Sequence, residues 1–422
     1  MKEIQPRSFI NAAVRMPGSK SITHRALITA SLAEGRSLLK DFLYCEDTLF
    51  TVNALRELGV EISIKGDDAA VSGMGGNFSP GAGKIEFFLG NSGTSFRLLL
   101  SVVALCRGEF LLTGAQRMLK RPVGPLVKAL DQLGVEAFCV QEKGFPPVQV
   151  KGNGIRGGKV FIEGHESSQF ISSLLLAAPY ARNGFEMKVT GELVSKPYVD
   201  ITIDIMGRFG VHIDRDGYSY FRVLSGQEYQ AGEFAIQGDA SSASYFWAAA
   251  AVTGGTVVTE NIYPYVTRQG DIRFLEVLER MGCFVEKKPD RVVVRGGRLS
   301  GLEVDMNTMP DMAPTLAAIG LFAKGQTAIR NVAHLRHKES DRLRCVALEW
   351  SRLGGRVEEL EDGLVVHGDE RLSGTVVGPH NDHRLAMALA VVGLRVPGTR
   401  IEDETCVNKS FPQFWELWER MK

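Results

Sequence analysis

The chain repeats one structural unit six times, and this repetition limits its fold more than any other feature does. Each copy has a small polar or charged cluster, then about three turns of Ala- and Leu-rich sequence that usually stop at Gly, as helices do. The period of about 72 residues is too regular for chance and too long for a solenoid. We therefore expect repetition of a whole subdomain, with copies that start near Gly18, Gly90, Glu166, Gly238, Pro310 and Asn381.

A second, amphipathic helix follows in most copies, as in NALRELGVEI, KALDQLGVEA, DIMGRFGVHI, EVLERMGCFV and, less closely, EWSRLGGRVEEL. The terminal WELWERMK resembles a sixth. Short β-branched runs between the helices predict strands and hairpins. Each copy thus reads roughly as strand, helix, strand, helix, strand, strand. At 422 residues, we expect an α/β protein of two domains, each with three copies and small mixed sheets. The first helices are apolar nearly all round, which predicts that they are buried.

Charge and cysteine content exclude several classes of protein. Forty-nine Lys and Arg balance 49 Asp and Glu, so no net field draws the chain to nucleic acid or an anionic membrane. The six cysteines are scattered without a C-x-x-C pair, which argues against a zinc site or a disulfide framework. The N-terminal stretch lacks the apolar core of a secretory signal, and no apolar run reaches membrane-spanning length. We expect a cytoplasmic, stand-alone monomer with reduced thiols.

Cations occupy the starts of several first helices, where the helix dipole ordinarily disfavours them. Lys20 and Arg25 lie in the first copy, Arg97 in the second and Arg384 in the sixth. Any one of them could be a solvated side chain, but recurrence at equivalent places favours bound anions. Free backbone N–H groups at helix N-termini also attract anions. If two domains face each other, these helix starts would surround the cleft between them.

Two polar clusters could contribute to such a site. The sequence GNSGTS at 90–95 and the run Ser167-Ser168-Gln169 provide hydroxyls and close backbone approach for phosphate or carboxylate oxygens. The same residues are also ordinary helix N-caps. The stretch HLRHKESDRLR at 334–344 is predicted to place Lys338, Glu339 and Arg342 within one helical turn. A carboxylate beside two cations can accept a proton from a substrate hydroxyl, although an exposed charged helix start would look the same.

Three other patterns carry no function. GNGIRG at 152–157 has the dinucleotide-binding spacing but lies between two predicted strands, so it predicts a turn. GSKS at 18–21 lacks the Gly-Lys order and the earlier Gly of a phosphate-binding P-loop. His334 and His337 have no third nearby His or Cys ligand. The sequence therefore predicts neither nucleotide nor metal binding.

Ten motifs in fixed order resemble those of the 5-enolpyruvylshikimate-3-phosphate synthases: PGSKSITHRALI, LGNSGTSFR, RPVGPLV, SSQF, SKPYVD, GDASSASYF, PDMAPT, HKESDRL, NDHRLAM and NKSFP. The resemblance runs from about residue 15 to about residue 412. It implies two domains, each of three β-α-β-α-β-β repeats in an inside-out α/β barrel, with the active site in the interdomain cleft. The chain of such proteins crosses between domains twice, which implies one domain at 19–237 and another at 1–18 plus 238–422.

The resemblance also implies an activity, the transfer of enolpyruvyl from phosphoenolpyruvate to the 5-hydroxyl of shikimate 3-phosphate, with no cofactor or metal. The residues that match the family's shikimate 3-phosphate ligands are Lys20, Ser21, Arg25, Ser167, Ser168, Gln169, Ser195, Tyr198, Asp311 and Lys338. Those that match its phosphoenolpyruvate ligands are Lys20, Asn91, Gly93, Arg121, Gln169, Arg342, Arg384 and Lys409, with Asp239 and His383 near the cleft. Proton handling would fall to Lys20, Asp311 and Glu339, in a division that the sequence leaves open.

The chain departs from the family pattern at three positions, since His334 replaces a common Asn, Leu98 a common Pro and Ser92 a common Ala. Sensitivity to the inhibitor glyphosate is therefore left open. One alternative is the sister enzyme that acts on UDP-N-acetylglucosamine, but its loop Cys is missing from TGAQRMLKRPVG. Another is a non-catalytic phosphometabolite-binding protein, against which the set Lys20, Asp311, Glu339 and Arg384 argues.

Overall fold

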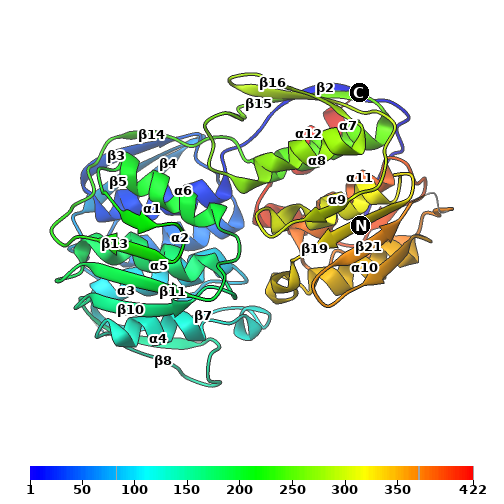
Figure 1. Ribbon diagram of the computed structural model, residues 1–422. Coiled ribbons are helices and arrows are strands. Elements are labelled where there is room, and N and C mark those ends of the chain that lie inside the picture. The colour runs from blue at the N-terminus through cyan, green and yellow to red at the C-terminus, as the bar shows by residue number, and fades with distance from the viewer. Residues whose placement is uncertain (82, 369–370, 422) are drawn as a thin grey trace. The chain divides into compact units, whose positions relative to one another are not determined.

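The structure is a computed structural model that describes residues 1–81, 83–368 and 371–421. The chain forms two compact units, one of Gly18–Ile236 and one of Met1–Pro17 with Gln237–Lys422. Each unit contains small mixed sheets and helices rather than one continuous sheet (Figure 1). The predicted α/β class with separate small sheets is confirmed, and each unit is described by itself below.

Two consecutive repeats of the unit Gly18–Ile236 show the predicted order of elements. In each, the first two strands are parallel and joined by a buried helix, and the last two form an antiparallel hairpin against the second strand. The first of these repeats comprises β6 (Lys84–Phe88), α3 (Gly93–Leu105), β7 (Arg107–Thr113), α4 (Gly124–Gln132), β8 (Glu136–Cys139) and β9 (Val148–Asn153). The second comprises β10 (Gly158–Glu163), α5 (Ser168–Ala177), β11 (Phe185–Thr190), α6 (Pro197–Arg208), β12 (Asp214–Asp216) and β13 (Tyr220–Val223).

The remaining repeat of this unit takes its first strand from far along the chain. Its helices and strands are α1 (Lys20–Leu32), β3 (Glu34–Lys40), α2 (Glu46–Glu57), β4 (Glu61–Lys65) and β5 (Asp68–Met74). Strand β14 (Glu233–Ala235) pairs parallel with β3, beginning with Glu233 opposite Leu38. Strand β14 thus occupies the place that β6 and β10 hold in their own sheets.

The other unit makes the reciprocal exchange. Strand β2 (Asn11–Arg15) precedes α1 in sequence but pairs parallel with β15 (Thr256–Glu260). The sheet is completed by a hairpin, in a repeat with α7 (Ala240–Thr253), α8 (Phe274–Met281), β16 (Phe284–Lys287) and β17 (Arg291–Arg295). The next repeat contains β18 (Glu303–Asp305), η4 (Pro310–Met312), α9 (Ala313–Gly320), β19 (Gln326–Arg330), η5 (Ala333–His337), α10 (Arg342–Arg352), β20 (Arg356–Glu359) and β21 (Leu364–His367).

The sixth copy differs from the common pattern because, among the described residues, no hairpin of its own completes its sheet. It comprises β22 (Val376–Val377), α11 (His383–Gly393), β23 (Arg400–Ile401), η6 (Thr405–Lys409) and α12 (Phe414–Arg420). Strand β1 (Lys2–Glu3) pairs antiparallel with β23 instead, so the N-terminal residues take the place of the missing strand. The described part of this sheet therefore has three strands where the other sheets have four.

The first helix of each repeat is buried, as the sequence predicts. All residues of α7 are buried, and only Lys20 and Ser21 of α1 are partly exposed. Helix α3 packs against α5, and α9 packs against α11 and α7, so each unit has its own helical core. Close packing fixes the first turns of these helices, and with them the polar side chains that those turns carry. Among the described residues, no helix is long and apolar enough to cross a membrane.

Candidate active site

Lys20 opens α1 and forms an ion pair with an acid that the sequence did not single out. Its Nζ lies 3.0 Å from Oδ2 of Asp47, and the two side chains are 11% and 2% exposed. The backbone oxygen of Asp47 accepts a hydrogen bond from Ser95 Oγ at 3.0 Å, so this pair connects the starts of α1, α2 and α3. In sequence, Asp47 resembles an ordinary acidic residue in a helix first turn. Only its burial beside Lys20 distinguishes it.

Arg25 is a buried cation whose hydrogen-bond partners in the described part of the chain are all neutral. Its guanidinium donates to Thr202 Oγ1 at 2.7 Å, to the backbone oxygens of Ser21 and Tyr198 at 2.9 and 3.2 Å, and to Ser172 Oγ at 3.2 Å. Burial lowers the pKa of Arg25 to about 10. A guanidinium held in the interior without a carboxylate is a strong indication of an anionic ligand, because an unpaired buried charge is otherwise costly.

The other predicted residues near Arg25 lie at the start of α6. Ser195 is buried and has a φ of 55°, in the left-handed region that a non-glycine residue seldom adopts. Its backbone oxygen accepts from the N–H of Tyr198 at 3.1 Å. The backbone thus turns sharply just before α6 and presents Tyr198 to Arg25. Strained backbone of this kind is concentrated at functional sites.

Arg97 on α3 joins the helix starts of α3 and α5. Its Nη1 donates to Gln169 Oε1 at 2.8 Å and to Ser167 Oγ at 3.5 Å. Gln169 Nε2 in turn donates to Thr94 Oγ1 at 3.0 Å. Ser167 is the N-cap of α5 and accepts from the N–H of Gln169 at 3.3 Å, and Ser168 is buried at the first position of that helix. The predicted Ser167-Ser168-Gln169 run is therefore both a helix cap and part of a cationic cluster.

Arg121 lies against the glycine-containing start of α3. Its Nη1 donates to the backbone oxygen of Asn91 at 2.8 Å and to the Asn91 side chain at 3.3 Å. A Cβ atom on Gly93 would lie 2.4 Å from Nη2 of Arg121, so glycine is required for this close approach. Ser92 caps the helix, and Leu98 is fully buried on it. These two departures from the family pattern therefore lie on α3 or at its N-cap, and α3 is the helix that carries Arg97 and whose start contacts Arg121.

In the other unit, Arg342 is the centre of a buried ionic cluster. Its side chain is 1% exposed and forms ion pairs with three carboxylates, those of Asp311, Glu339 and Asp382, each at 2.8 Å. Asp382 is the fully buried N-cap of α11 and accepts the backbone N–H of Arg384 at 3.0 Å. The motif NDHRLAM contained Asp382, but its sequence position suggests only a cap. Its ionic role depends on α10 and α11 being close.

Asp311 lies between two arginines. Its Oδ1 accepts from Arg342 and its Oδ2 accepts from Arg384 Nη2 at 2.7 Å. Burial by itself would raise the pKa of Asp311, but the charges of Arg384, Lys338 and Arg342 hold it well below its usual value. The carboxylate is therefore ionised at neutral pH and can accept a hydrogen bond from a ligand hydroxyl.

The segment 334–344 corrects one expectation. Lys338, Glu339 and Arg342 were predicted to share one helical turn, but η5 ends at His337, Lys338 is extended, and α10 begins at Arg342. Asp341 caps α10 and stops the helix from starting earlier. Burial and the nearby charge of Lys338 lower the pKa of His334 to about 3, so this imidazole is neutral at physiological pH.

The remaining predicted residues of this unit lie at the ends of short helices or at helix starts. Asp239 caps α7 by accepting the N–H of Ser242 at 2.9 Å, and Tyr245 on that helix accepts from Arg384 Nη1 at 3.4 Å. His383 is buried beside Asp382 at the start of α11. Lys409 ends η6 and is 6% exposed. This unit thus holds buried cations at the starts of α10 and α11 and at the end of η6.

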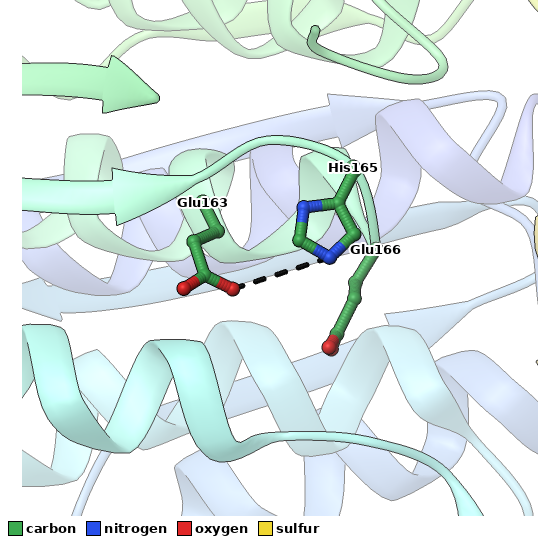
Figure 2. Close-up of side chains that lie close together, drawn as sticks. All are labelled: Glu163, His165 and Glu166. Atoms are coloured by element: carbon green, nitrogen blue, oxygen red, sulfur yellow. Dashed lines mark ion pairs between the residues drawn. The ribbon is translucent and has the colours of Figure 1, made fainter. Parts of the chain in front are cut away.

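A separate group of titratable side chains lies at the end of β10 and does not include any predicted site residue. The ligand atoms of Glu163, His165 and Glu166 all lie within 4.8 Å of one another, and His165 Nε2 is 4.0 Å from Glu163 Oε2 (Figure 2). The Glu163 and His165 side chains are 53% and 61% exposed. Structural zinc sites hold their ligands in fixed, closed geometry, so this open cluster does not match one. Among the described residues, His334 and His337 belong to no such group.

Comparison with known proteins gives consistent results. A family model described as EPSP synthase (3-phosphoshikimate 1-carboxyvinyltransferase) matches residues 4–418. Similar proteins named 3-phosphoshikimate 1-carboxyvinyltransferase include one from Syntrophobacter fumaroxidans, 46% identical over 100% of this chain and 99% of the relative, and one from Methanoculleus marisnigri, 47% identical over 96% of each. A solved structure of EPSP synthase from Acinetobacter baumannii aligns with a TM-score of 0.82 at 29% identity, over 99% of this chain and 97% of that one.

Proposed function

Because the chain belongs to the EPSP synthase family, we propose that it transfers the enolpyruvyl group of phosphoenolpyruvate to the 5-hydroxyl of shikimate 3-phosphate and releases phosphate. The reaction would serve the shikimate pathway to chorismate and the aromatic amino acids. The single observation that carries the proposal is Asp311, an ionised carboxylate between Arg342 and Arg384. The carboxylate can accept a hydrogen bond from a substrate hydroxyl, and the two guanidinium groups can bind an anion. A reaction between a hydroxyl and an anionic enol ester requires both.

Shikimate 3-phosphate is proposed to bind the cluster around Arg25. The buried guanidinium with neutral partners would pair with the phosphate, and its neighbours would supply hydroxyl and backbone contacts. The proposed ligands are Lys20, Ser21, Arg25, Ser167, Ser168, Gln169, Ser195 and Tyr198, with Asp311 and Lys338 for the ring hydroxyls. Asp311 as a carboxylate would accept the hydrogen bond of the attacking hydroxyl.

Phosphoenolpyruvate is proposed to bind the arginine-rich groups. Its carboxylate and its phosphate each carry several oxygens, and an arginine guanidinium can donate two parallel hydrogen bonds to either group. The proposed ligands are Lys20, Asn91, Gly93, Arg121, Gln169, Arg342, Arg384 and Lys409. The glycine at position 93 fits this role, because it lets the backbone approach Arg121 closely.

The proposed chemistry has two steps. A proton is added to the methylene carbon of phosphoenolpyruvate while the substrate hydroxyl loses its proton and attacks the adjacent carbon, giving a tetrahedral adduct. Loss of phosphate, with removal of a proton from the new methyl group, then restores the enol ether. Lys20, Asp311 and Glu339 are the proposed proton carriers. The arginines stabilise the negative charge that moves onto the departing phosphate.

The test is phosphate release from phosphoenolpyruvate with either shikimate 3-phosphate or UDP-N-acetylglucosamine. We expect release only with shikimate 3-phosphate, and its loss in Glu339→Ala and Lys20→Ala. Arg356→Gln, on an exposed arginine that pairs with Glu358, is the matched surface control. Release with the nucleotide sugar would transfer the protein to the sister activity. Release with neither acceptor would favour a non-catalytic binding protein.

The cellular setting and domain roles complete the proposal. We propose that the protein acts in the cytoplasm as a monomer, and light scattering that showed a stable dimer would contradict the monomeric state. We also propose that the segments near 19–237 and 1–18 plus 238–422 are the two enolpyruvyl transferase domains. The pairing of β2 and β14 supports this division, because each strand belongs to a different unit from the helix that follows it, α1 after β2 and α7 after β14.

A further inference from the structure

Asp271 is a buried acid that neither the sequence motifs nor the proposed ligand sets include. It lies in η3 (Gly270–Arg273) and is 5% exposed. Ser241 Oγ donates a hydrogen bond to its Oδ2. Its Oδ1 is buried and has no hydrogen-bond partner within the described part of the chain. A buried carboxylate with one unpaired oxygen is costly, so this environment favours a carboxyl that keeps its proton.

Helix α7 connects Asp271 to the ionic cluster. Ser241 and Tyr245 are four residues apart and therefore share one face of this helix. Ser241 holds Asp271, and the Tyr245 hydroxyl accepts from Arg384. The two contacts on successive turns place Asp271 on the side of the cluster where Arg384 meets Asp311.

The charges of two nearby acids act in the same direction as burial. Burial, followed by the negative charge of Asp311, raises the pKa of Asp271 to about 7, and Asp239 adds to this effect. The charge of Arg384 and the hydrogen bond from Ser241 oppose it. Asp311, by contrast, stays ionised. Two acids near one arginine thus differ in protonation, a pattern typical of sites in which acids have separate roles.

We propose that Asp271 is a positioning residue of the phosphoenolpyruvate site. While the carboxyl group of Asp271 is protonated, the charge of Arg384 is available to Asp311 and the substrate. The inference rests on the proposed function, in which Arg384 binds phosphoenolpyruvate. When Asp271 ionises, it places a second negative charge near Arg384 and weakens the attraction for the anionic substrate. The effect falls on substrate binding rather than on the chemical step.

The test compares the KM for phosphoenolpyruvate and kcat of wild type, Asp271→Asn and the surface control Asp290→Asn, from about pH 6 to about pH 8.5. Asparagine keeps the shape and the Ser241 acceptor but cannot ionise. Protonation of the substrates is common to all three proteins, so it cancels in ratios. We expect the ratio of wild-type KM to Asp271→Asn KM to rise about fivefold across this range, with no such trend in the kcat ratio. The ratio to Asp290→Asn should stay flat, because that acid is on an exposed turn.

Ser241→Ala provides a second variant that leaves Asp271 in place. It removes a hydrogen bond that favours the ionised form, so the rise in KM should move to higher pH. A KM profile of Asp271→Asn parallel to wild type, or a pH trend confined to kcat, overturns the proposal. If Asp271→Asn fails to fold, Ser241→Ala is the deciding variant. A rise in its KM for phosphoenolpyruvate at the same pH as in wild type also overturns the proposal. Failure of the proposed function is distinguished by wild-type enzyme that releases no phosphate at any pH.

Discussion

Replacing Arg342 with Gln should destabilise the unit that contains it by about 4 kcal/mol, because one partner of a buried charge cluster is removed. The side chain is 1% exposed and neutralises Asp311, Glu339 and Asp382, of which Asp382 is fully buried. Gln is shorter and uncharged, so it cannot bond all three acids. Arg384 still pairs with Asp311, whereas Asp382 loses its ion pair with Arg342 and keeps the hydrogen bond from Ser340.

The assay is thermal and urea unfolding at pH 7, followed by signals from each unit. For a unit of this size, about 4 kcal/mol corresponds to a fall in Tm of about 8–16 °C. The loss should shrink in acid. Asp311 has a lowered pKa, so its stabilising contribution is present above its unfolded pKa of 3.8 and is lost as pH falls toward the lower folded value. The stabilities of wild type and variant should therefore begin to converge below about pH 4 and should meet as the pH approaches the lower folded pKa of Asp311.

Two results would refute this reasoning. A Tm within about 2 °C of wild type at pH 7 would mean that the cluster contributes little net stability. A Tm difference that is equally large in acid would mean that lost packing, rather than uncompensated charge, causes the destabilisation. Arg356→Gln is the control, because its arginine is 63% exposed and its ion pair should contribute little.

Three further outcomes are expected. Arg25→Gln should weaken shikimate 3-phosphate binding about 100-fold by calorimetry, because the buried cation is lost, and unchanged affinity would contradict the assignment. Gly93→Ala should raise the KM for phosphoenolpyruvate, because the added Cβ would displace Arg121. Gly207→Ala on α6 is the control, since its Cβ would meet open space and should leave the KM unchanged. Equal effects of the two variants would exclude displacement of Arg121 as the cause. His334→Asn should leave the pH profile of kcat unchanged above pH 5, because the imidazole has a pKa of about 3. If wild-type kcat changes with pH near 6 and the variant lacks this change, the imidazole titrates there and the prediction is contradicted.

The residues that approach one another across repeats were only partly predictable. Lys20, Arg25, Arg121, Arg342 and Arg384 were expected to be site residues, and the structure places each in a buried polar cluster. Three acids that lie beside these cations were missed. Asp47, Asp271 and Asp382 occupy helix first turns, caps or short turns, where acids are common for local reasons.

The helical turn predicted for Lys338, Glu339 and Arg342 failed for a related reason. The charge spacing of HKESDRL fits a helix, but Asp341 accepts the N–H of Arg344 and caps α10 at that point. Glu339 still reaches Arg342 from the preceding loop, because the two are three residues apart. Local charge pattern thus identified the contact but not the backbone that makes it.

The sequence by itself determined the repeat, the helices and their burial, because a helix that is apolar all round, such as α7, can be stable only in an interior. It also determined which cations lie at helix starts, since that follows from position along one helix. Tertiary structure alone decided which strand completes each sheet, as with β14 beside β3 and β1 beside β23. It also decided which acids pair with Lys20, Arg342 and Arg384. Strand pairing and ion pairing both depend on contacts between residues far apart in the chain, and the sequence around each residue does not identify its partner.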